Sequence, residues 1–487
     1  MTYMRSLIGH GQTPTARGPA PNTSGCSADG GRAGSAAGEQ DVARAVTSAD
    51  EAFAAWSAVP PPERSALFLQ AAQILVLRTS QIVDTMASEV GATATWSSFN
   101  AKLAAQILIE AAGAVTHPTG QVLPTETPGA HSIHVRLPLG VVAAIAPWNA
   151  PLILAARAVA LPLALGNTVV LKASEEAPLS GGRLLQSALK EAGLPDGVLN
   201  VVTHARGDAA AVVSALAADP RVRAVNFTGS AAVGRTVAVE AARHLKPSVL
   251  ELGGKNSLLI MEDADVDYAV GAAVFSAFMN AGQSCLSTDR IFVQRPLADE
   301  FVARLSERVT ALPDSDPSWP AGTTGPLVHS RAAERVSALV SDALSKGATA
   351  LAGTGTVEAP GTLVAPVVLT DVTPDMDIWS AEIFGPVVVV HVADNADEAV
   401  ALANEPPCGL TAGVITSDWA AGLNIAHRLR AGAVHVNNQD VAGQAKAPFG
   451  GIRDSGYGRF GGQAGIEAFT DTRWITLGAG GRPVFPL

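Results

Sequence analysis

The chain has 487 residues, of which 48% are hydrophobic and 16% charged, so it is long enough to bury more than one core and should divide into two or three domains. Acidic residues outnumber basic ones by 44 to 33, which gives a net charge of -11 and, with no run of Lys or Arg, argues against nucleic acid as a partner. Three cysteines, Cys26, Cys285 and Cys408, are too few for a disulfide framework and favour a reducing compartment, so we expect a cytoplasmic protein.

The sequence predicts no association with a membrane. Its most apolar stretch, residues 140–172, is interrupted by Pro147, Arg157 and Pro162, and no window of about 20 apolar residues remains. The N-terminal segment also lacks the apolar core of a secretory signal.

The first quarter of the chain divides into a tail and a helical region. Residues from about 11 to 38 are rich in Gly, Ala, Ser, Pro and Thr without a period, and such a composition buries too little apolar area to offset its ordering entropy, so residues 1–40 are predicted to form an irregular tail. From residue 41 to about residue 114, apolar residues recur at helical spacing, so several packed helices should follow.

From residue 168 onward, short β-branched runs alternate with helical patterns, which is typical of βαβ units and a parallel sheet. The predicted strands are 168–171, 198–202, 222–227 and 248–252, and the predicted helices are 181–191, 209–217 and 231–244. A second series after Glu262 has a helix leading to Cys285 and strands at 291–293, 387–392 and 433–437, so we expect a second α/β domain.

Two further predicted strands, at residues 131–137 and 473–477, lie outside these series. Both segments alternate along the chain as half-buried strands do. Such strands add to a neighbouring subunit's sheet or form a loose hairpin on their own domain, and the sequence leaves both arrangements open.

Three side chains are candidates for catalysis. Cys285 follows a glycine-containing turn after a long apolar helical pattern, so it is either a nucleophile or a small core residue. Glu251 ends an apolar strand and precedes two glycines, where a carboxylate serves as a general base or as a helix cap or salt-bridge partner. Asn149 interrupts an apolar run and is either an amide donor for a developing oxyanion or a turn residue.

Two patterns are candidates for nucleotide binding. Gly229 and Ser230 open a helix after a strand, which makes a seat for a pyrophosphate. The segment from Gly229 onward also approaches a P-loop, but Arg235 stands where that motif needs lysine, which argues against a kinase or an ATPase. Lys172 ends a strand and Glu175 lies three residues on, a pair suited to ribose hydroxyls or to a surface salt bridge.

Neither metal chemistry nor serine hydrolysis is supported by a motif. The ten histidines have no metal-ligand spacing, since His131 and His134 are three apart in a predicted strand and face opposite sides, so no metal is expected. Without a G-x-S-x-G motif, a serine hydrolase of the nucleophile-elbow type has no support.

Seven motifs, taken in order, resemble those of the aldehyde dehydrogenase superfamily from about residue 41 to the end of the chain. They are APWN at 146–149, GNTVVLK at 166–172, FTGS at 227–230, LELGGK at 250–255, GQSC at 282–285, EIFGP at 382–386 and PFGG at 448–451. The resemblance implies an α/β fold with a Rossmann-type NAD-binding domain and an α/β catalytic domain. The expected boundaries are 41–119 and 139–250 for the NAD-binding domain, 251–469 for the catalytic domain, and 120–138 and 470–487 for a small β oligomerisation arm.

The resemblance also implies a mechanism. Cys285 looks like the thiolate nucleophile that attacks an aldehyde, with the Asn149 side chain and the Cys285 backbone N–H as the oxyanion hole. The thiohemiacetal then passes a hydride to a nicotinamide. Glu251 looks like the base that activates water to hydrolyse the thioester, which favours a hydrolytic enzyme over a coenzyme-A-acylating one.

By the same resemblance, the cofactor is NAD and the protein is a homodimer or homotetramer. Lys172 and Glu175 would hold the adenosine ribose, and the Glu175 carboxylate would repel a 2′-phosphate, which favours NAD over NADP. The complete predicted cofactor site comprises Pro147, Trp148, Lys172, Glu175, Gly229, Ser230, Glu382 and Phe384.

Within the superfamily, the chain is most similar to bacterial dehydrogenases of aromatic aldehydes, and Phe460 stands where most members have glutamate. Trp96 and Arg157 are predicted to line an aromatic substrate pocket. Arg157 has a competing interpretation as the partner of a substrate carboxylate, as in a semialdehyde dehydrogenase, and a non-catalytic member of the fold is a further alternative. The predicted tail departs from the family, which begins with strands at this place.

Overall fold

The computed structural model describes residues 38–478, apart from 118–119, 127, 313–323, 356 and 359–360. The predicted tail, residues 1–40, lies outside the described residues except for its last three, and helix α2 already begins at Glu39. Cys26 and the last part of the predicted arm, residues 479–487, also lie outside them.

The predicted helical region consists of four helices, which confirms the periodicity. Gly91 ends one of them in the left-handed conformation, with a φ of 66°, and Thr93 caps the next by accepting the Trp96 N–H at 3.3 Å. The helices are α2 (Glu39–Ser57), α3 (Pro61–Leu77), α4 (Thr79–Val90) and α5 (Ala94–Ala114).

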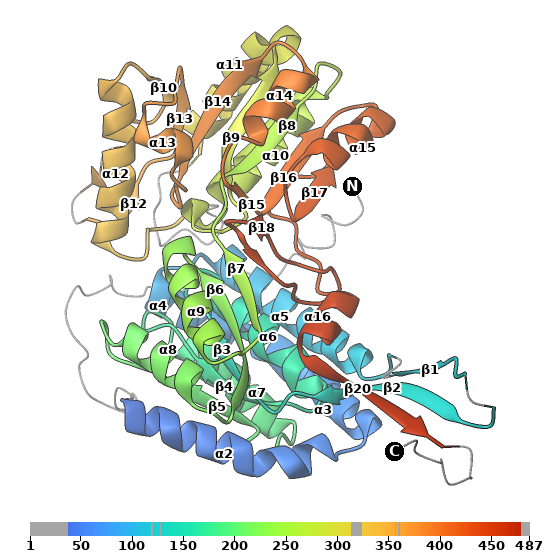
Figure 1. Cartoon of the computed structure of the whole chain (residues 1–487). Helices are drawn as coiled ribbons and strands as arrows, with labels where there is room; N and C mark the ends of the chain where they lie inside the picture. Colours follow the sequence, from blue (N-terminus) through green and yellow to red (C-terminus); the bar gives the residue numbers. More distant parts are fainter. Residues whose placement is uncertain are drawn as a thin grey trace. The chain divides into compact units, whose positions relative to one another are not determined.

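The first sheet has six strands in the order β19-β7-β6-β3-β4-β5, all parallel except β19 (Figure 1). The strands are β3 (Val141–Ile145), β4 (Thr168–Lys172), β5 (Leu199–Val202), β6 (Val222–Gly229), β7 (Ser248–Leu252) and β19 (Gly456–Tyr457). The helices that connect them are α6 (Pro151–Ala164), α7 (Leu184–Glu191), α8 (Ala209–Ala218) and α9 (Ala231–Arg243). The four predicted strands and the parallel sheet are confirmed.

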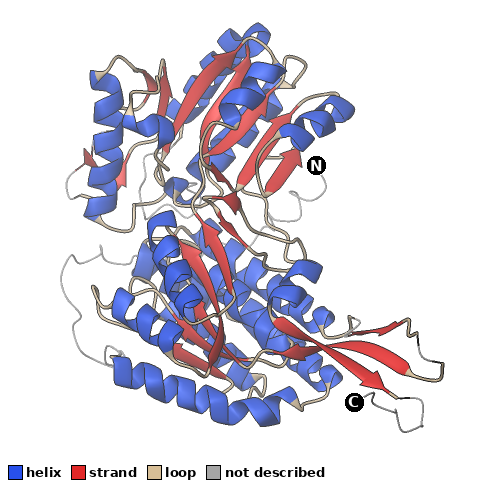
Figure 2. Ribbon diagram, viewed as in Figure 1, coloured by secondary structure: helices blue, strands red, loops and turns tan. Residues whose placement is uncertain are grey.

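Both faces of this sheet are buried, which explains why its strands are apolar throughout. In β3, Val142 and Ala144 enter a core that includes α5 and α6, whereas Val141, Ala143 and Ile145 enter a second core that includes α2, α8 and α9. Helices accordingly cover both sides of the sheet (Figure 2).

The helix predicted over 181–191 differs from the observed one at its start. Residues Leu179–Arg183 form a π-helical turn, η1, before α7 begins. A Cβ on Gly182 would lie 2.7 Å from a methyl group of Val201, so the glycine allows this turn to lie directly against β5.

The second sheet has seven strands in the order β10-β13-β14-β9-β8-β16-β17, parallel except for the edge strand β10. The strands are β8 (Asn256–Ile260), β9 (Thr288–Gln294), β10 (Thr349–Ala352), β13 (Val367–Thr370), β14 (Val387–Ala393), β16 (Thr411–Ile415) and β17 (Ala433–Val436). Its helices are α10 (Val266–Phe278), α11 (Arg295–Thr310), α12 (Ser330–Ser345), α13 (Asp377–Ser380), α14 (Ala396–Ala403) and α15 (Trp419–Arg428). The strands predicted at 291–293, 387–392 and 433–437 are confirmed.

The two strands predicted outside the βαβ series pair with each other. β1 (Gly120–Leu123), β2 (His131–Pro138) and β20 (Thr470–Leu477) form an antiparallel sheet in the order β1-β2-β20. Across it, Trp474 Nε1 donates to Ser132 Oγ at 2.8 Å. The chain thus pairs these strands with one another, and their addition to a neighbouring subunit stays a prediction.

The predicted domain boundary between residues 250 and 251 falls inside a strand, because β7 continues to Leu252. A second difference involves Gly456 and Tyr457, which lie in the range expected for the catalytic domain but pair with β7 as β19. Periodicity within one segment carries no signal for such a pairing, because its two strands lie far apart in the sequence.

Within the described residues, no single helix has the length and apolar composition needed to cross a membrane. Helices α3 and α4 meet that criterion only together, and the chain bends by 68° between them. Both helices pack against α5.

The Asn167 side chain joins the first sheet to the end of the β2–β20 arm where β2 finishes and β20 begins. It is fully buried, and its Oδ1 accepts the backbone N–H groups of Leu139 and Gly140 at 2.7 and 3.1 Å. Its Nδ2 donates to the carbonyl oxygens of Pro162 and Phe469 at 3.0 and 2.9 Å. All four hydrogen-bonding positions of the amide are therefore used.

Replacing this side chain in Asn167→Ala leaves two backbone N–H groups and the Phe469 carbonyl group without their partner, whereas the Pro162 carbonyl keeps its bond from the backbone N–H of residue 167. We expect the free energy of unfolding to fall by about 3 kcal/mol, because unpaired buried polar groups carry their full desolvation cost. Urea unfolding followed by tryptophan fluorescence measures the change. The exposed Gln463→Ala is the control, and an Asn167→Ala midpoint equal to that of the control contradicts the prediction.

Candidate active site

Cys285 follows a turn with an unusual backbone. After α10, the chain enters a short turn, η2 (Met279–Gly282), in which Asn280, Ala281 and Gly282 have φ values of 54°, 55° and 69°. A Cβ on Gly282 would lie 2.0 Å from the carbonyl oxygen of Gly385, so only glycine allows these two segments to touch. Strained backbone of this kind persists where surrounding contacts over-determine it.

Gln283 supplies many of those contacts. Its side chain is buried, and its Nε2 donates to the carbonyl oxygens of Asn280 and Pro326, each at 3.2 Å. Its Oε1 accepts the Val328 N–H at 2.9 Å. Gln283 thus connects the turn to residues 326–328, which precede α12.

Asn149 lies in the turn between β3 and α6 and contacts this loop directly. Its side chain is 5% exposed, and its Nδ2 donates to the Gln283 carbonyl oxygen at 3.1 Å. Its own carbonyl oxygen accepts from Trp96 Nε1 at 2.9 Å and from Asn280 Nδ2 at 3.2 Å. One of the two N–H bonds of the Asn149 amide is therefore used to hold the loop, and the other is free to act on a substrate.

Four predicted residues, Trp96, Asn149, Arg157 and Cys285, line one cavity. Its other walls are Phe99, Leu103, Ala150, Ile153, Leu154, Ser284, Leu286, Val441, Gly443 and Phe449. The Trp96 and Phe99 rings stack with centroids 5.5 Å apart. The cavity therefore combines an apolar, aromatic wall with a thiol, an amide and a guanidinium group.

Arg157 enters this cavity as a cation without an ionic partner. Its Cζ lies 4.0 Å from the centroid of the Phe449 ring, a cation–π contact. Burial lowers the pKa of Arg157, whereas Glu251 and Cys285 act in the opposite direction. Among the described residues, its guanidinium group makes no ion pair or hydrogen bond, so its donors are free to contact a ligand.

Glu251 lies in β7 between Thr228 of β6 and Gly456 of β19. It is 1% exposed, and neither carboxylate oxygen has a hydrogen-bond partner within the described residues. Burial raises its pKa to about 7, against the opposing effects of Cys285, Arg157 and Thr228. A carboxylate with this pKa can take up and release a proton near neutral pH.

The Cys285 thiol is affected by the same surroundings. Burial raises its pKa well above the ordinary value, and the negative charges of Glu251 and Glu382 raise it further, while Arg157 acts to lower it. The thiol form therefore predominates at neutral pH. The reciprocal effects on the two pKa values place Cys285 and Glu251 beside each other, although no motif joins them in the sequence.

Glu382 and Phe384 come from the loop before β14 and face the same region. Glu382 Oε1 accepts the Gly254 N–H at 3.2 Å, and burial raises the pKa of Glu382 to about 7. A Cβ on Gly253 would lie 2.2 Å from Glu382 Oε2, so this glycine makes room for the carboxylate. The Phe384 ring meets Trp148, which follows Pro147, edge-on at 5.8 Å.

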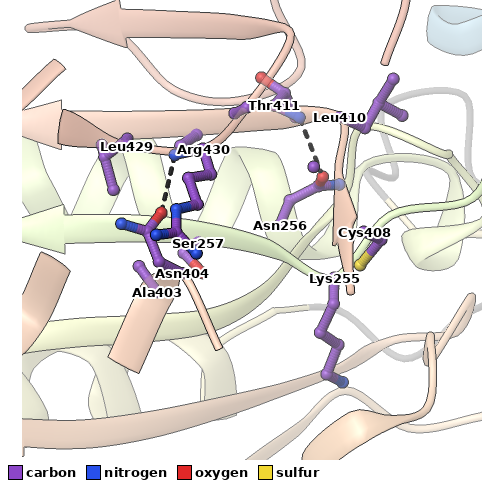
Figure 3. Close-up of a pocket in the computed structure, with 13 residues that line it drawn as sticks. Lys255, Asn256, Ser257, Ala403, Asn404, Cys408, Leu410, Thr411, Leu429 and Arg430 are labelled. Carbon is purple, nitrogen blue, oxygen red and sulfur yellow. Dashed lines mark hydrogen bonds between the residues drawn. The ribbon is translucent and has the colours of Figure 1, made fainter. Parts of the chain in front are cut away.

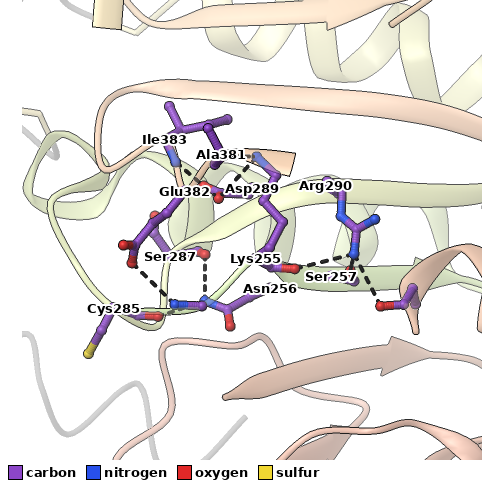
Figure 4. A network of polar contacts seen from close by, with 12 residues as sticks. Lys255, Asn256, Ser257, Cys285, Ser287, Asp289, Arg290, Ala381, Glu382 and Ile383 are labelled. Atoms are coloured by element: carbon purple, nitrogen blue, oxygen red, sulfur yellow. Dashed lines mark hydrogen bonds and ion pairs between the residues drawn. The ribbon is translucent and has the colours of Figure 1, made fainter. Parts of the chain in front are cut away.

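A buried ion pair holds the Glu382 loop in place. Lys255 Nζ lies 3.2 Å from Asp289 Oδ2 and donates to the Ala381 carbonyl oxygen at 2.6 Å (Figure 4). Asp289 Oδ2 also accepts the Ile383 N–H at 3.2 Å. Because both partners are nearly inaccessible to solvent, the loss of either one would leave an uncompensated charge.

Lys172 and Glu175 lie at the end of β4, where ligands bind in parallel α/β sheets. They form no ion pair with each other, and Glu175 Oε2 lies 3.5 Å from His204 Nε2 instead. Lys172 is 6% exposed, and burial lowers its pKa although Glu175 opposes the shift. Burial alone would raise the pKa of Glu175, but a backbone hydrogen bond, Lys172 and His204 together lower it, so the carboxylate is ionised.

Gly229 and Ser230 lie where β6 meets α9. Ser230 caps that helix, because its side chain accepts the Val233 N–H at 3.4 Å. Arg235, which argued against a P-loop, pairs instead with Asp454 at 2.7 Å. The predicted nucleotide residues are thus at the carboxyl ends of β3, β4 and β6, and the structure does not bring Lys172, Glu175 or Ser230 into the Cys285 cavity.

Sequence reasoning missed several residues of the site. Phe449 belongs to the quoted PFGG motif, but no role was assigned to it, and His204, whose Nε2 lies 3.5 Å from Glu175, was not singled out. Asn280 and Gln283 are polar residues close to Cys285 in the sequence, and this closeness is the only sequence feature that links them to the site. Their hydrogen-bond partners are remote in the sequence, so the pairing was not predictable.

Comparison with known proteins identifies the family of this chain. A family model described as "Aldehyde dehydrogenase family" matches residues 30–475. This chain belongs to the aldehyde dehydrogenase family. The predicted superfamily and α/β fold are confirmed, and the aldehyde dehydrogenase is an oxidoreductase that converts an aldehyde to the carboxylic acid.

Its relatives include proteins named for aromatic aldehydes. A vanillin dehydrogenase of Pseudomonas fluorescens is 47% identical over 443 residues, which cover 91% of each chain. An NAD(+) benzaldehyde dehydrogenase of Pseudomonas putida is 40% identical over 439 residues, covering 90% of this chain and 89% of the relative. The crystal structure of a salicylaldehyde dehydrogenase from Pseudomonas putida G7, complexed with salicylaldehyde, is similar with a TM-score of 0.89 at 39% identity and covers 93% of each chain.

The coupling between the two acidic groups of this aldehyde dehydrogenase leads to a test. Above pH 7 the ionised Glu251 disfavours the Cys285 thiolate, so Glu251→Gln should lower the pKa of Cys285. The rate of Cys285 alkylation by iodoacetamide, followed by mass spectrometry as a function of pH, should therefore rise at a lower pH in the variant. The exposed Glu63→Gln serves as the control, and a profile that stays in place or moves to higher pH contradicts the coupling.

Proposed function

We propose that this enzyme oxidises an aromatic aldehyde to its carboxylic acid, with Cys285 as the nucleophile and NAD as the hydride acceptor. One observation carries the proposal: Cys285 shares an aromatic cavity with the Asn149 amide, and the unpaired Glu251 carboxylate lies beside the thiol. The names of the vanillin, benzaldehyde and salicylaldehyde relatives support the substrate class.

The first step is the attack of the Cys285 sulfur on the carbonyl carbon. A C–S bond forms, the carbonyl electron pair moves to oxygen, and the thiol proton is released to solvent, so that Glu251 remains ionised for the later hydrolysis. The second N–H of the Asn149 amide and the backbone N–H of Cys285 stabilise the oxyanion. Within the described chain this backbone N–H has no other hydrogen-bond acceptor, so it is available for that purpose.

The residues at the end of β4 fit an adenosine ribose. The buried Lys172 ammonium group has no hydrogen bond or ion pair among the described residues, and the ionised Glu175 offers acceptors for ribose hydroxyls. The same carboxylate would repel a 2′-phosphate, which favours NAD over NADP. Ser230, at the N-terminus of α9, would contact the pyrophosphate.

Glu382 and Phe384, with Pro147 and Trp148 opposite, would position the nicotinamide ribose. Gly253 supports this assignment, because its missing side chain leaves the Glu382 carboxylate space at the site. When bound, NAD would supply the acceptor for the hydride that leaves the Cys285 thiohemiacetal and yields a thioester.

Glu251 completes the reaction as a general base. Its two unpaired oxygens can orient a water molecule and take its proton as the water oxygen attacks the thioester carbon. The C–S bond then breaks, the electron pair returns to the Cys285 sulfur, and the carboxylic acid leaves. A buried carboxylate with a pKa of about 7 suits this task at neutral and slightly alkaline pH.

Aromatic rings fit the cavity because Trp96, Phe99 and Phe449 form its walls. Arg157 would donate to a ring hydroxyl or methoxy oxygen, since its guanidinium group has no protein acceptor. The same free cation favours a second candidate function, in which Arg157 binds the carboxylate of a semialdehyde.

The proposal also covers the roles of the two large sheets, the role of the β1-β2-β20 arm and the cellular location. The first sheet with its helices would bind NAD, and the second sheet would carry the nucleophile. The β1-β2-β20 arm would join subunits into a homodimer or a homotetramer, as expected for strands with unpaired edges. The protein would act in the cytoplasm, consistent with its sparse cysteines.

Two substitutions test the mechanism in one kinetic experiment. Cys285→Ala should abolish NADH formation and leave NAD binding, measured by quenching of tryptophan fluorescence, unchanged. Glu251→Gln should retain a pre-steady-state burst of NADH but lower steady-state turnover by about 100-fold, the usual scale of general-base catalysis. Turnover by Cys285→Ala, or an unimpaired steady state in Glu251→Gln, overturns the corresponding role.

A substrate panel tests the cavity. With NAD, kcat/KM for benzaldehyde, vanillin and salicylaldehyde should exceed that for hexanal and succinic semialdehyde by about tenfold or more, because several aromatic contacts distinguish them. Arg157→Ala should reduce kcat/KM for salicylaldehyde and vanillin more than for benzaldehyde, which lacks a second oxygen. A preference for succinic semialdehyde that Arg157→Ala removes would instead support the carboxylate-binding alternative.

A further inference from the structure

We infer that Asn256 is a positioning residue for the nucleophile, which it holds through the backbone of the Cys285 loop. The inference rests on the proposed role of Cys285. Asn256 is the first residue of β8, and its side chain is 4% exposed. It does not line the aromatic cavity and does not take part in any step above.

The Asn256 amide binds three backbone groups from two segments. Its Nδ2 donates to the carbonyl oxygen of Cys285 at 2.7 Å and to that of Ser287 at 2.9 Å. Its Oδ1 accepts the N–H of Thr411, the first residue of β16, at 3.2 Å (Figure 3). The amide therefore connects the nucleophile loop to the centre of the second sheet.

These partners leave one possible orientation for the amide. The two carbonyl groups require N–H donors, and the Thr411 N–H requires an acceptor, so all three bonds form only with the nitrogen toward the loop. An aspartate would turn oxygens toward two carbonyl oxygens, and a serine has a single hydrogen to donate. Among side chains of this size, asparagine alone satisfies the whole arrangement.

The backbone around Asn256 is adapted to this amide. A Cβ on Gly254 would lie 2.4 Å from Asn256 Oδ1, so the second glycine of the LELGGK motif makes room for it. The register between β8 and β9 also shifts between Asn256 and Ser257. The regular ladder is thus interrupted where the side chain reaches the loop.

The bonds act on the side of the loop opposite the thiol. The Cys285 carbonyl faces the Asn256 amide, whereas its Sγ points the other way (Figure 4). Within the loop, Ser284 Oγ accepts the Leu286 N–H at 3.2 Å, and Ser287 Oγ donates to the Ser276 carbonyl oxygen at 2.9 Å. Because Cβ and the backbone N–H of Cys285 are both attached to one Cα, holding the carbonyl restricts the position from which the nucleophile and its oxyanion donor extend.

The test is Asn256→Asp, which keeps the shape and removes both donors. We expect the rate of the NADH burst and the kcat to fall by about 10- to 100-fold, the scale for a nucleophile misplaced by about 1 Å, with little change in the KM for NAD. The pH profile of Cys285 alkylation should change as well, because the thiol leaves its position beside Glu251. Asn256→Ser, which introduces no charge, should show the same pattern more weakly.

The matched control is Asn167→Asp, which alters an equally buried, fully bonded amide away from Cys285. It should lower thermal stability but leave the alkylation profile unchanged. If Asn256→Asp does not fold, Asn256→Ser supplies the same readouts. The inference is overturned if a folded Asn256 variant has an NADH burst rate and a Cys285 alkylation rate within twofold of the parent while Cys285→Ala remains inactive. An active Cys285→Ala overturns the proposed function itself.

Discussion

The hydrogen bond from Asn149 Nδ2 to the Gln283 carbonyl oxygen, 3.1 Å long, joins the two halves of the site. Asn149 follows a strand of the six-stranded sheet, and Gln283 follows a helix that covers the seven-stranded one. Two bonds to the Asn149 carbonyl oxygen, from Trp96 and Asn280, reinforce this contact. The aromatic cavity, the thiol and the amide donor occupy fixed positions because these bonds cross between segments that share no local structure.

Around that contact, the dominant physical effect is the desolvation of charge. Glu251 is buried and Glu382 partly so, and desolvation raises the pKa of each to about 7, while the same surroundings raise the pKa of Cys285. A buried carboxylate without hydrogen bonds destabilises the folded protein, so its retention is expected where a proton must be exchanged. By contrast, the buried Lys255–Asp289 pair is bonded to the Ala381 carbonyl and the Ile383 N–H and gives the Glu382 loop its position.

Much of the fold was predictable from local patterns. Apolar residues with a period of 3.6 located the helices after residue 38, and β-branched runs located the strands of the parallel sheets, because burial selects side chains at those spacings. Local patterns carry no signal for pairings that are remote in the sequence. The expected boundary at residue 250 lies within β7, Gly456 and Tyr457 pair with β7 as β19, and the contacts of Phe449 and His204 join segments far apart in the chain.

The sequence by itself determined the family, the α/β fold and the residue types available for chemistry, since motifs such as GQSC and LELGGK are local and in order. Only the tertiary structure decided that Cys285, Asn149 and Arg157 share a cavity, that Glu251 lies unpaired beside the thiol, and that Asn256 holds the nucleophile loop. The reason is physical. A pKa and a hydrogen bond depend on burial and on neighbours that the chain brings together only when both sheets have formed.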